Sequence, residues 1–203
     1  MVNISGGSIG YFNPANNSVI NFSGGSLFQS FAGAGTINII GGVITDELRA
    51  YGVSVINVSG GTSNFEINSY GGVVNFTGGY NTLDLNAALG GVFNLSGGSF
   101  GSSLYVDDNS TMNLTGMGLS AALVDSDHIY NGLDQTYNGK RFTEYMLSGV
   151  LADRSSVNGK MLFVQNGTGA KFTLTNVPAP ASLPVFAVGL MGVGLGVLRK
   201  RRK

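Results

Sequence analysis

Apolar and polar residues alternate in seven short segments of the chain, each of which ends in Gly-Gly or a close variant. The first segment is Val2-Asn3-Ile4-Ser5-Gly6-Gly7, and the others begin at Ile20, Ile37, Ile56, Val74, Phe93 and Met112. Their starts are 18, 17, 19, 18, 19 and 19 residues apart. Strict alternation predicts a β-strand with one buried face. The glycines predict a bend, because glycine reaches positive φ without a Cβ clash.

A coil of 17–19 residues cannot bury its apolar face alone, so equivalent strands are expected to stack. The pattern predicts an all-β fold, a parallel β-solenoid (β-helix) of about seven coils over residues 1–124. An antiparallel sandwich is the alternative, although it needs strand-reversing turns at less regular spacing. An inward-facing row is expected at the sixth residue after the second glycine, which in copies two to six is Phe31, Leu48, Ile67, Leu85 and Leu104.

Residues 125–176 break the period and contain three further alternating stretches. Solenoids need caps to protect their last open edge, so we expect a non-repeating β cap here. At the other end Val2 already lies inside a repeat, and no cationic and apolar leader precedes it. Exported proteins need such a leader, which predicts that the natural chain extends further upstream.

Composition narrows the possible partners. Charged residues make up 11% of the chain, and the absence of cysteine excludes disulfides and thiolate metal sites. Before Lys140 the single cation is Arg49, against nine carboxylates. The body of the protein therefore has no basic face, which excludes nucleic acid as a partner.

The last 27 residues, 177–203, form a third region that is apolar and then strongly cationic. Leu183 to Leu198 is an uncharged stretch, and it is followed by Arg199, Lys200, Arg201, Arg202 and Lys203. From Val177 to Leu198 a helix would measure roughly 33 Å, enough to cross a ~30 Å hydrocarbon core. We therefore predict a single C-terminal hydrophobic transmembrane helix, with the cations on the cytoplasmic side and the solenoid outside. The alternative is an ordinary anchor that is never processed.

The order of parts in this region is similar to a known sorting signal. Val177-Pro178-Ala179-Pro180-Ala181, an apolar glycine-rich stretch and a cationic end resemble the PEP-CTERM signal, in its V-P-L-P-A variant. Ala179 replaces the leucine of that variant and the glutamate of the commonest form. The resemblance implies an exosortase-type sorting enzyme as partner, in a Gram-negative bacterium that makes exopolysaccharide. It also implies export, anchoring in the inner membrane before processing, and a final place on the outer surface or in the extracellular matrix.

Asparagine occupies the second position of every copy, and the stacked coils should join these residues into a row of hydrogen-bonded amides. A second register contains carboxylates five residues after the second glycine, at Glu47, Glu66 and Asp84. Neighbours such as Phe65 and Leu83 are apolar and are expected to face inward, so the acids should face outward about 4.8 Å apart. Such a stack could bind Ca²⁺ through oxygen ligands. The favoured alternative is a solubilising edge with no cofactor, because like charges this close repel one another.

Acidic residues and the single histidine also gather in sequence where the repeat ends. They are Asp107, Asp108, Asp125, Asp127, His128 and Asp134. Carboxylates beside a histidine suggest acid–base chemistry. No positioning motif accompanies them, and Asp is a common turn residue, which favours solvated turns and no catalytic residues.

These features together favour a non-catalytic surface or matrix protein associated with exopolysaccharide. Its repeats resemble those of β-helix adhesins of the autotransporter type. A polysaccharide-active β-helix lyase or glycosidase is the first alternative, because fold alone does not decide function. The second alternative is the stalk of a larger protein with its activity upstream.

Overall fold

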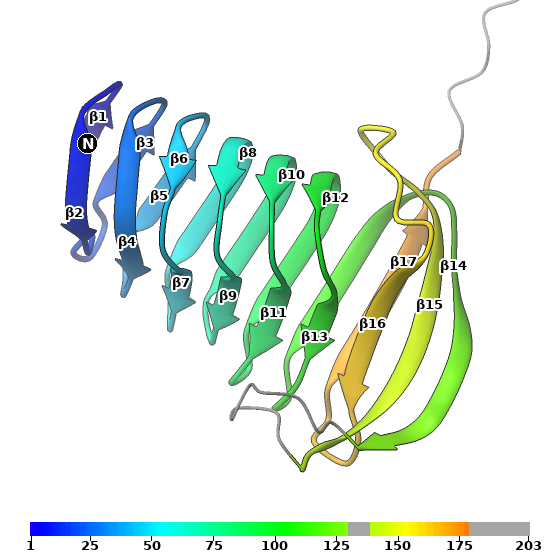
Figure 1. Ribbon diagram of the computed structural model, residues 1–203. Coiled ribbons are helices and arrows are strands. Elements are labelled where there is room, and N and C mark those ends of the chain that lie inside the picture. The colour runs from blue at the N-terminus through cyan, green and yellow to red at the C-terminus, as the bar shows by residue number, and fades with distance from the viewer. Residues whose placement is uncertain (130–138, 179–203) are drawn as a thin grey trace, which may run out of the picture.

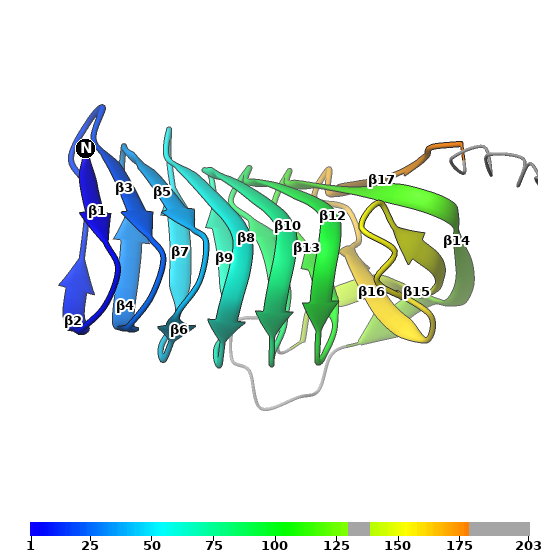
Figure 2. The ribbon, with the colours of Figure 1, turned by 90° about the horizontal axis from the view of Figure 1, so that it is seen from above.

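The computed structural model of the protein describes residues 1–129 and 139–178. The described part is all-β, with 17 strands joined into one hydrogen-bonded sheet. Figures 1 and 2 show the strands coiling side by side from β1 to β13, with β14 to β17 gathered at the far end. The coil makes about six turns of parallel β-solenoid, which confirms the predicted fold class in its β part.

Three parallel ladders run along the solenoid, and each of coils two to six contributes one rung to each ladder. The first ladder contains the predicted Asn-bearing strands: β1 (Val2–Ile4), β3 (Val19–Phe22), β5 (Thr36–Ile39), the first halves of β8 (Val55–Ser63), β10 (Val73–Asn81) and β12 (Val92–Phe100), and the start of β14 (Thr111–Ile129). Asn3 pairs with Asn21, Asn21 with Asn38, and the same register continues to Asn113. The period in the sequence is therefore the stacking period of the coils.

The other two ladders follow the glycine pair of each coil. The second contains β2 (Ser8–Phe12), the start of β4 (Ser26–Ala32), β6 (Val43–Ile44) and the second halves of β8, β10 and β12. The third contains the end of β4, then β7 (Leu48–Tyr51), β9 (Ile67–Tyr70), β11 (Leu85–Ala88), β13 (Leu104–Val106) and β16 (Lys160–Gln165).

The core lies inside the coil and is filled by the alternating apolar residues. At the first and third positions of copies two to seven the side chains are 0–6% exposed, from Ile20 and Phe22 to Met112 and Leu114. Full burial of a side chain of this size contributes roughly 1.5–3 kcal/mol, so each coil adds several such terms. The first copy lies at the open end of the stack, where Val2 is 51% exposed.

The second glycine of each pair permits the bend between the first and second ladders. From Gly7 to Gly98 these glycines have φ between +78° and +94°. A Cβ at Gly25 would lie 2.3 Å from the carbonyl oxygen of Gly7 in the preceding coil. Both the dihedral angle and the close approach of coils therefore require glycine here.

The seventh copy does not continue directly into a coil as the first six do, and the structure has about six turns where about seven were predicted. In this copy Met117 stands where the other copies have their positive-φ glycine. A residue with a Cβ resists that conformation. The strand therefore does not bend, and β14 runs on without interruption to Ile129.

A hairpin and two returning strands form the end of the structure. β15 (Arg141–Leu151) pairs antiparallel with β14 and then with β16. β16 stacks on β13 in parallel, and β17 (Lys171–Asn176) stacks on the start of β14 with Phe172 beside Met112. Residues 160–176 therefore extend the third and first ladders by one rung each, and the β14–β15 hairpin is an insertion within the last coil.

The predicted inward row of the third ladder is confirmed from Leu48 to Leu104, whose side chains are all 0% exposed, and Leu162 continues it. The register differs in coil two, where Ser30 and not Phe31 pairs with Leu48, and Phe31 pairs with Arg49. The corner of coil two is one residue shorter than in later coils, which shifts the register by one.

Phe65 and Leu83 were expected to face inward, and this is also wrong, because they are 43% and 40% exposed. The corner between the second and third ladders interrupts the alternation at these two residues. Buried polar side chains hold the corner backbone instead: the Ser63 hydroxyl donates to the Phe65 carbonyl at 3.1 Å, and the Asn81 amide donates to the Leu83 carbonyl at 2.9 Å.

The predicted fold class needs one further correction, which concerns the helix. Residues 1–129 and 139–178 contain strands, turns and bends but no helix, and therefore none that could span a membrane. The predicted transmembrane helix was measured from Val177 to Leu198, and its apolar stretch, Leu183 to Leu198, lies outside the described residues. Over the described residues the structure therefore supports the all-β solenoid and contains no helix.

Candidate functional site

The row of asparagines on the first ladder is continuous over all seven copies. In each step the Nδ2 group donates to Oδ1 of the preceding asparagine at 2.7–2.8 Å, and the row consists of Asn3, Asn21, Asn38, Asn57, Asn75, Asn94 and Asn113. The predicted amide row is confirmed. A side-chain amide has two donors and two acceptor sites, so each inner Asn keeps one N–H and one lone pair for an outside ligand.

The three predicted carboxylates lie in one register at the corner before the third ladder, but each has its own hydrogen-bond partner. Glu47 contacts Arg49 and Asn68. Oε2 of Glu66 accepts from Nδ2 of Asn86 at 3.2 Å, and Oδ1 of Asp84 accepts from the backbone N–H of Ser103 at 2.7 Å. Within the described residues these acids are not among the carboxylates that converge on one point.

Their partners form a second polar row that the sequence analysis did not single out. Asn68 and Asn86 are buried on the outer side of the third ladder, and Nδ2 of Asn86 donates to Oδ1 of Asn68 at 2.6 Å. Three copies share the pattern acid, apolar residue, donor, as in Glu66-Ile67-Asn68. That repeated spacing was the signal available in the sequence, since residues two apart on a strand lie on the same face.

Two ionisable groups on the outer side of the third ladder have shifted pKa values. Burial raises the pKa of Tyr70 to about 12, and the Tyr70 ring lies 5.5 Å from that of Tyr51. Burial also raises the pKa of Asp107, opposed by the ammonium of Lys140, which lies 3.1 Å from Oδ2. The Asp107 side chain is 2% exposed, and its Oδ1 atom has no hydrogen-bond partner in the described part of the chain.

The acidic residues near the end of the repeat separate into different environments. Asp107 pairs with Lys140, and Asp127 pairs with Arg141. Asp108 has a positive φ of 45° in a turn. Asp134 lies outside the described residues.

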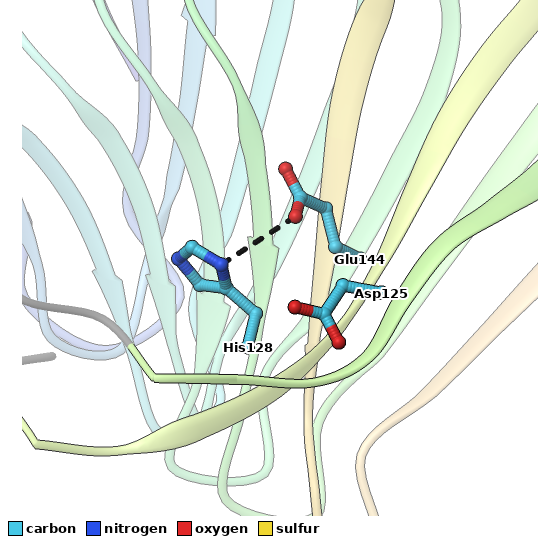
Figure 3. Close-up of side chains that lie close together, drawn as sticks. All are labelled: Asp125, His128 and Glu144. Carbon is cyan, nitrogen blue, oxygen red and sulfur yellow. Dashed lines mark ion pairs between the residues drawn. The ribbon is translucent and has the colours of Figure 1, made fainter.

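Asp125 and His128 meet a residue that the sequence analysis missed, Glu144 of β15 (Figure 3). Nδ1 of His128 lies 3.5 Å from Oε2 of Glu144. One ligand atom from each of the three residues lies within 4.8 Å of the others. Glu144 is far along the chain in an ordinary alternating strand, so only the pairing of β14 with β15 could reveal it.

Irregular strand pairing brings these three side chains together. Asp125 pairs with Glu144 and His128 pairs with Phe142, with register shifts on both sides of Asp125. Such β-bulges redirect side chains and are common near functional sites. The His128 ring also contacts Phe163 of β16, with ring centres 5.8 Å apart.

The sorting motif is only partly visible. The backbone N–H of Val177 donates to the carbonyl of Gly116 at 2.7 Å, which attaches the start of the motif to the end of the first ladder. Pro178 is exposed. Ala179, Pro180, Ala181 and the cations Arg199 to Lys203 lie outside the described residues.

No protein-family model, curated protein or solved structure matches this chain. The resemblance of the tail to the PEP-CTERM signal therefore has no support from a family match. The β-helix repeats are shown by the structure itself.

Proposed function

We propose that this chain is an exported, non-catalytic structural protein of the cell surface or extracellular matrix that associates with exopolysaccharide. The observation that carries the proposal is the unbroken Asn row along the first ladder. It presents the same hydrogen-bonding groups once per coil, at a spacing of about 4.8 Å. A polymer with repeated hydroxyl groups is a ligand suited to such a surface.

The charge distribution supports a polysaccharide over a charged macromolecule. Before Lys140 the chain has one cation and nine carboxylates. Amide and hydroxyl groups therefore dominate the first ladder, where Ser59 and Thr77 lie beside the Asn row and are exposed. These groups recognise sugar hydroxyls through neutral hydrogen bonds, which are individually modest and gain strength by repetition.

Delivery to the surface by an exosortase-type enzyme is the second part of the proposal. It is supported by the sequence of residues 177–203 and by its resemblance to the sorting signal. The start of the motif directly follows β17, so the folded solenoid ends where the motif begins. Val177 and Pro178 are exposed, and exposed residues at the end of a folded domain are accessible to a processing enzyme.

Polysaccharide binding is tested by co-sedimentation of the full chain with exopolysaccharide from an exosortase-bearing Gram-negative bacterium. The double variant Ser59→Asp with Thr77→Asp places two charges beside the Asn row and should abolish co-sedimentation. The matched control, Asn64→Asp with Ser99→Asp, places the same charges on exposed sites off the first ladder and should bind normally. Equal binding by both variants would remove the Asn row as the binding surface, and release of sugar fragments would indicate an enzyme.

Sorting is tested in the producing cell. Deletion of Val177–Lys203 should release the protein into the medium, and replacing both Pro178 and Pro180 by alanine should block processing while leaving the apolar stretch intact. If the deleted protein stayed in the envelope, these residues would not be its retention signal.

A further inference from the structure

Asp125, His128 and Glu144 form a cluster of possible metal ligands away from the Asn row. Polysaccharide binding by that row does not require them. Asp125 and His128 come from the outer part of β14, and Glu144 comes from β15. Figure 3 shows all three side chains directed toward one another. The cluster therefore spans the two strands of the inserted hairpin.

We propose that Asp125, His128 and Glu144 form a binding site for a divalent transition-metal ion, with Zn²⁺ as its probe. One imidazole nitrogen with two carboxylate oxygens suits Zn²⁺ and its first-row neighbours. Ca²⁺ and Mg²⁺ prefer shells made of oxygen alone. Three protein ligands leave one tetrahedral position for water, as in open zinc sites.

The distances fit this coordination with a small adjustment. Zinc bonds of about 2.0–2.2 Å place tetrahedral ligand atoms about 3.4 Å apart. The 3.5 Å between Nδ1 of His128 and Oε2 of Glu144 already matches this value. Ligand atoms up to 4.8 Å apart must approach by about 1.4 Å, and a rotamer change of the exposed Asp125 side chain can supply this.

The charges near the cluster also favour a cation. Glu144 is 16% exposed and pairs with His128, while Oδ1 of Asp125 accepts from the backbone N–H of Asp127 at 2.9 Å. The neighbouring cations Lys140 and Arg141 pair with other acids, Asp107 and Asp127. Within the described part of the chain, neither Asp125 nor Glu144 has a Lys or Arg partner. Two adjacent carboxylates without a balancing Lys or Arg attract a divalent ion.

The supporting residues around the cluster are already in place. Phe163 packs against the His128 ring and restricts its orientation. His128 pairs with Phe142, which pairs with Gln165, so these residues share one face of the sheet.

A metal at this position would join β14 to β15 near the end of the hairpin where β14 finishes and β15 begins. The ion would bind Nδ1 of His128 and hold the two strands together where their register is irregular. Binding to the folded state alone stabilises the fold by mass action. The ion would therefore act as a clamp on the end of the solenoid.

The test uses the tag-free full chain, because its single histidine gives one imidazole signal set in a long-range ¹H–¹⁵N spectrum. Addition of Zn²⁺ should shift the Nδ1 resonance and saturate at one equivalent, and it should raise the thermal midpoint. Equal concentrations of Ca²⁺ or Mg²⁺ should change neither. Glu144→Gln should weaken Zn²⁺ binding by roughly tenfold or more, as loss of a metal-site group typically does.

Asp127→Asn is the matched control, because it removes an acid from the same strand that pairs outside the cluster with Arg141. It should bind Zn²⁺ with unchanged affinity, and circular dichroism checks that both variants fold. The proposal would be overturned if Zn²⁺ left the imidazole resonances unchanged or if Ca²⁺ shifted them equally. It would also be overturned if Asp127→Asn and Glu144→Gln weakened Zn²⁺ binding to the same extent. None of these outcomes depends on polysaccharide binding.

Discussion

Asn75 lies in the middle of the Asn row, and its replacement by alanine measures what that row contributes to stability. Nδ2 of Asn75 donates to Asn57, and Oδ1 of Asn75 accepts from Asn94, both at 2.8 Å. Asn75→Ala removes both bonds and leaves one unpaired group on each neighbour. A net contribution of about 1 kcal/mol per bond predicts a loss of about 2 kcal/mol in the free energy of unfolding.

Asn3→Ala is the matched control, because Asn3 is at the open end of the same row. Its Oδ1 accepts one bond, from Asn21, and the residue is exposed. Water replaces that bond easily, so Asn3→Ala should cost well under 1 kcal/mol. The two substitutions delete the same atoms, and their difference therefore reports the contribution of the row and not the loss of an Asn side chain.

The assay is urea unfolding of the full chain followed by far-ultraviolet circular dichroism. Asn75→Ala should move the midpoint to lower urea with the slope unchanged, which indicates altered stability without altered exposed surface. In a thermal scan the same loss should lower the midpoint by about 4–8 °C for a chain of this size. If Asn75→Ala and Asn3→Ala differed by less than about 0.5 kcal/mol, the Asn row would not stabilise the stack.

Three further predictions concern other parts of the molecule. Gly79→Ala should cost at least about 1–2 kcal/mol, because Gly79 has φ +94° and an added Cβ would lie 2.9 Å from the Gly61 carbonyl oxygen. Gly90 has a similar φ of +79°, but an added Cβ would meet no atom within 4 Å, so Gly90→Ala should lower the free energy of unfolding in urea by less. Equal losses for the two substitutions would show that contact between neighbouring coils does not contribute to the cost at Gly79. Because burial raises the pKa of Asp107 above 3.8, the folded state binds its proton more tightly, so stability should fall as pH rises from 3.8 through the raised value. Asp107→Asn should flatten that pH dependence in unfolding curves, and an unchanged slope would assign it to other groups. Millimolar Ca²⁺ should leave the thermal midpoint unchanged, because Glu47, Glu66 and Asp84 each have a hydrogen-bond partner within the protein. A rise in the midpoint that Glu66→Gln abolishes would instead show that these three carboxylates bind calcium.

The sequence by itself determined the repeating part of this protein. Alternation of apolar and polar residues before each glycine pair is a local pattern, and strand stacking copies it from coil to coil. The pairing of Asn21 with Asn3 and the positive φ of Gly25 therefore follow from residues within one coil and their equivalents in the next. Equivalent residues contact one another in such a fold, so the period alone specifies most long-range contacts.

Only the tertiary structure decided the features that break this repetition. Met117 occupies the position of the second glycine, so β14 continues without a bend to Ile129. The chain then returns to the stack of coils as β16 and β17. The same hairpin brings Glu144 to His128, through bulges whose positions no periodicity encodes. These contacts join residues without a common register, so they depend on how the strands finally pair. That is why the sequence predicted the solenoid and its Asn row, while the candidate metal site emerged only from the folded hairpin.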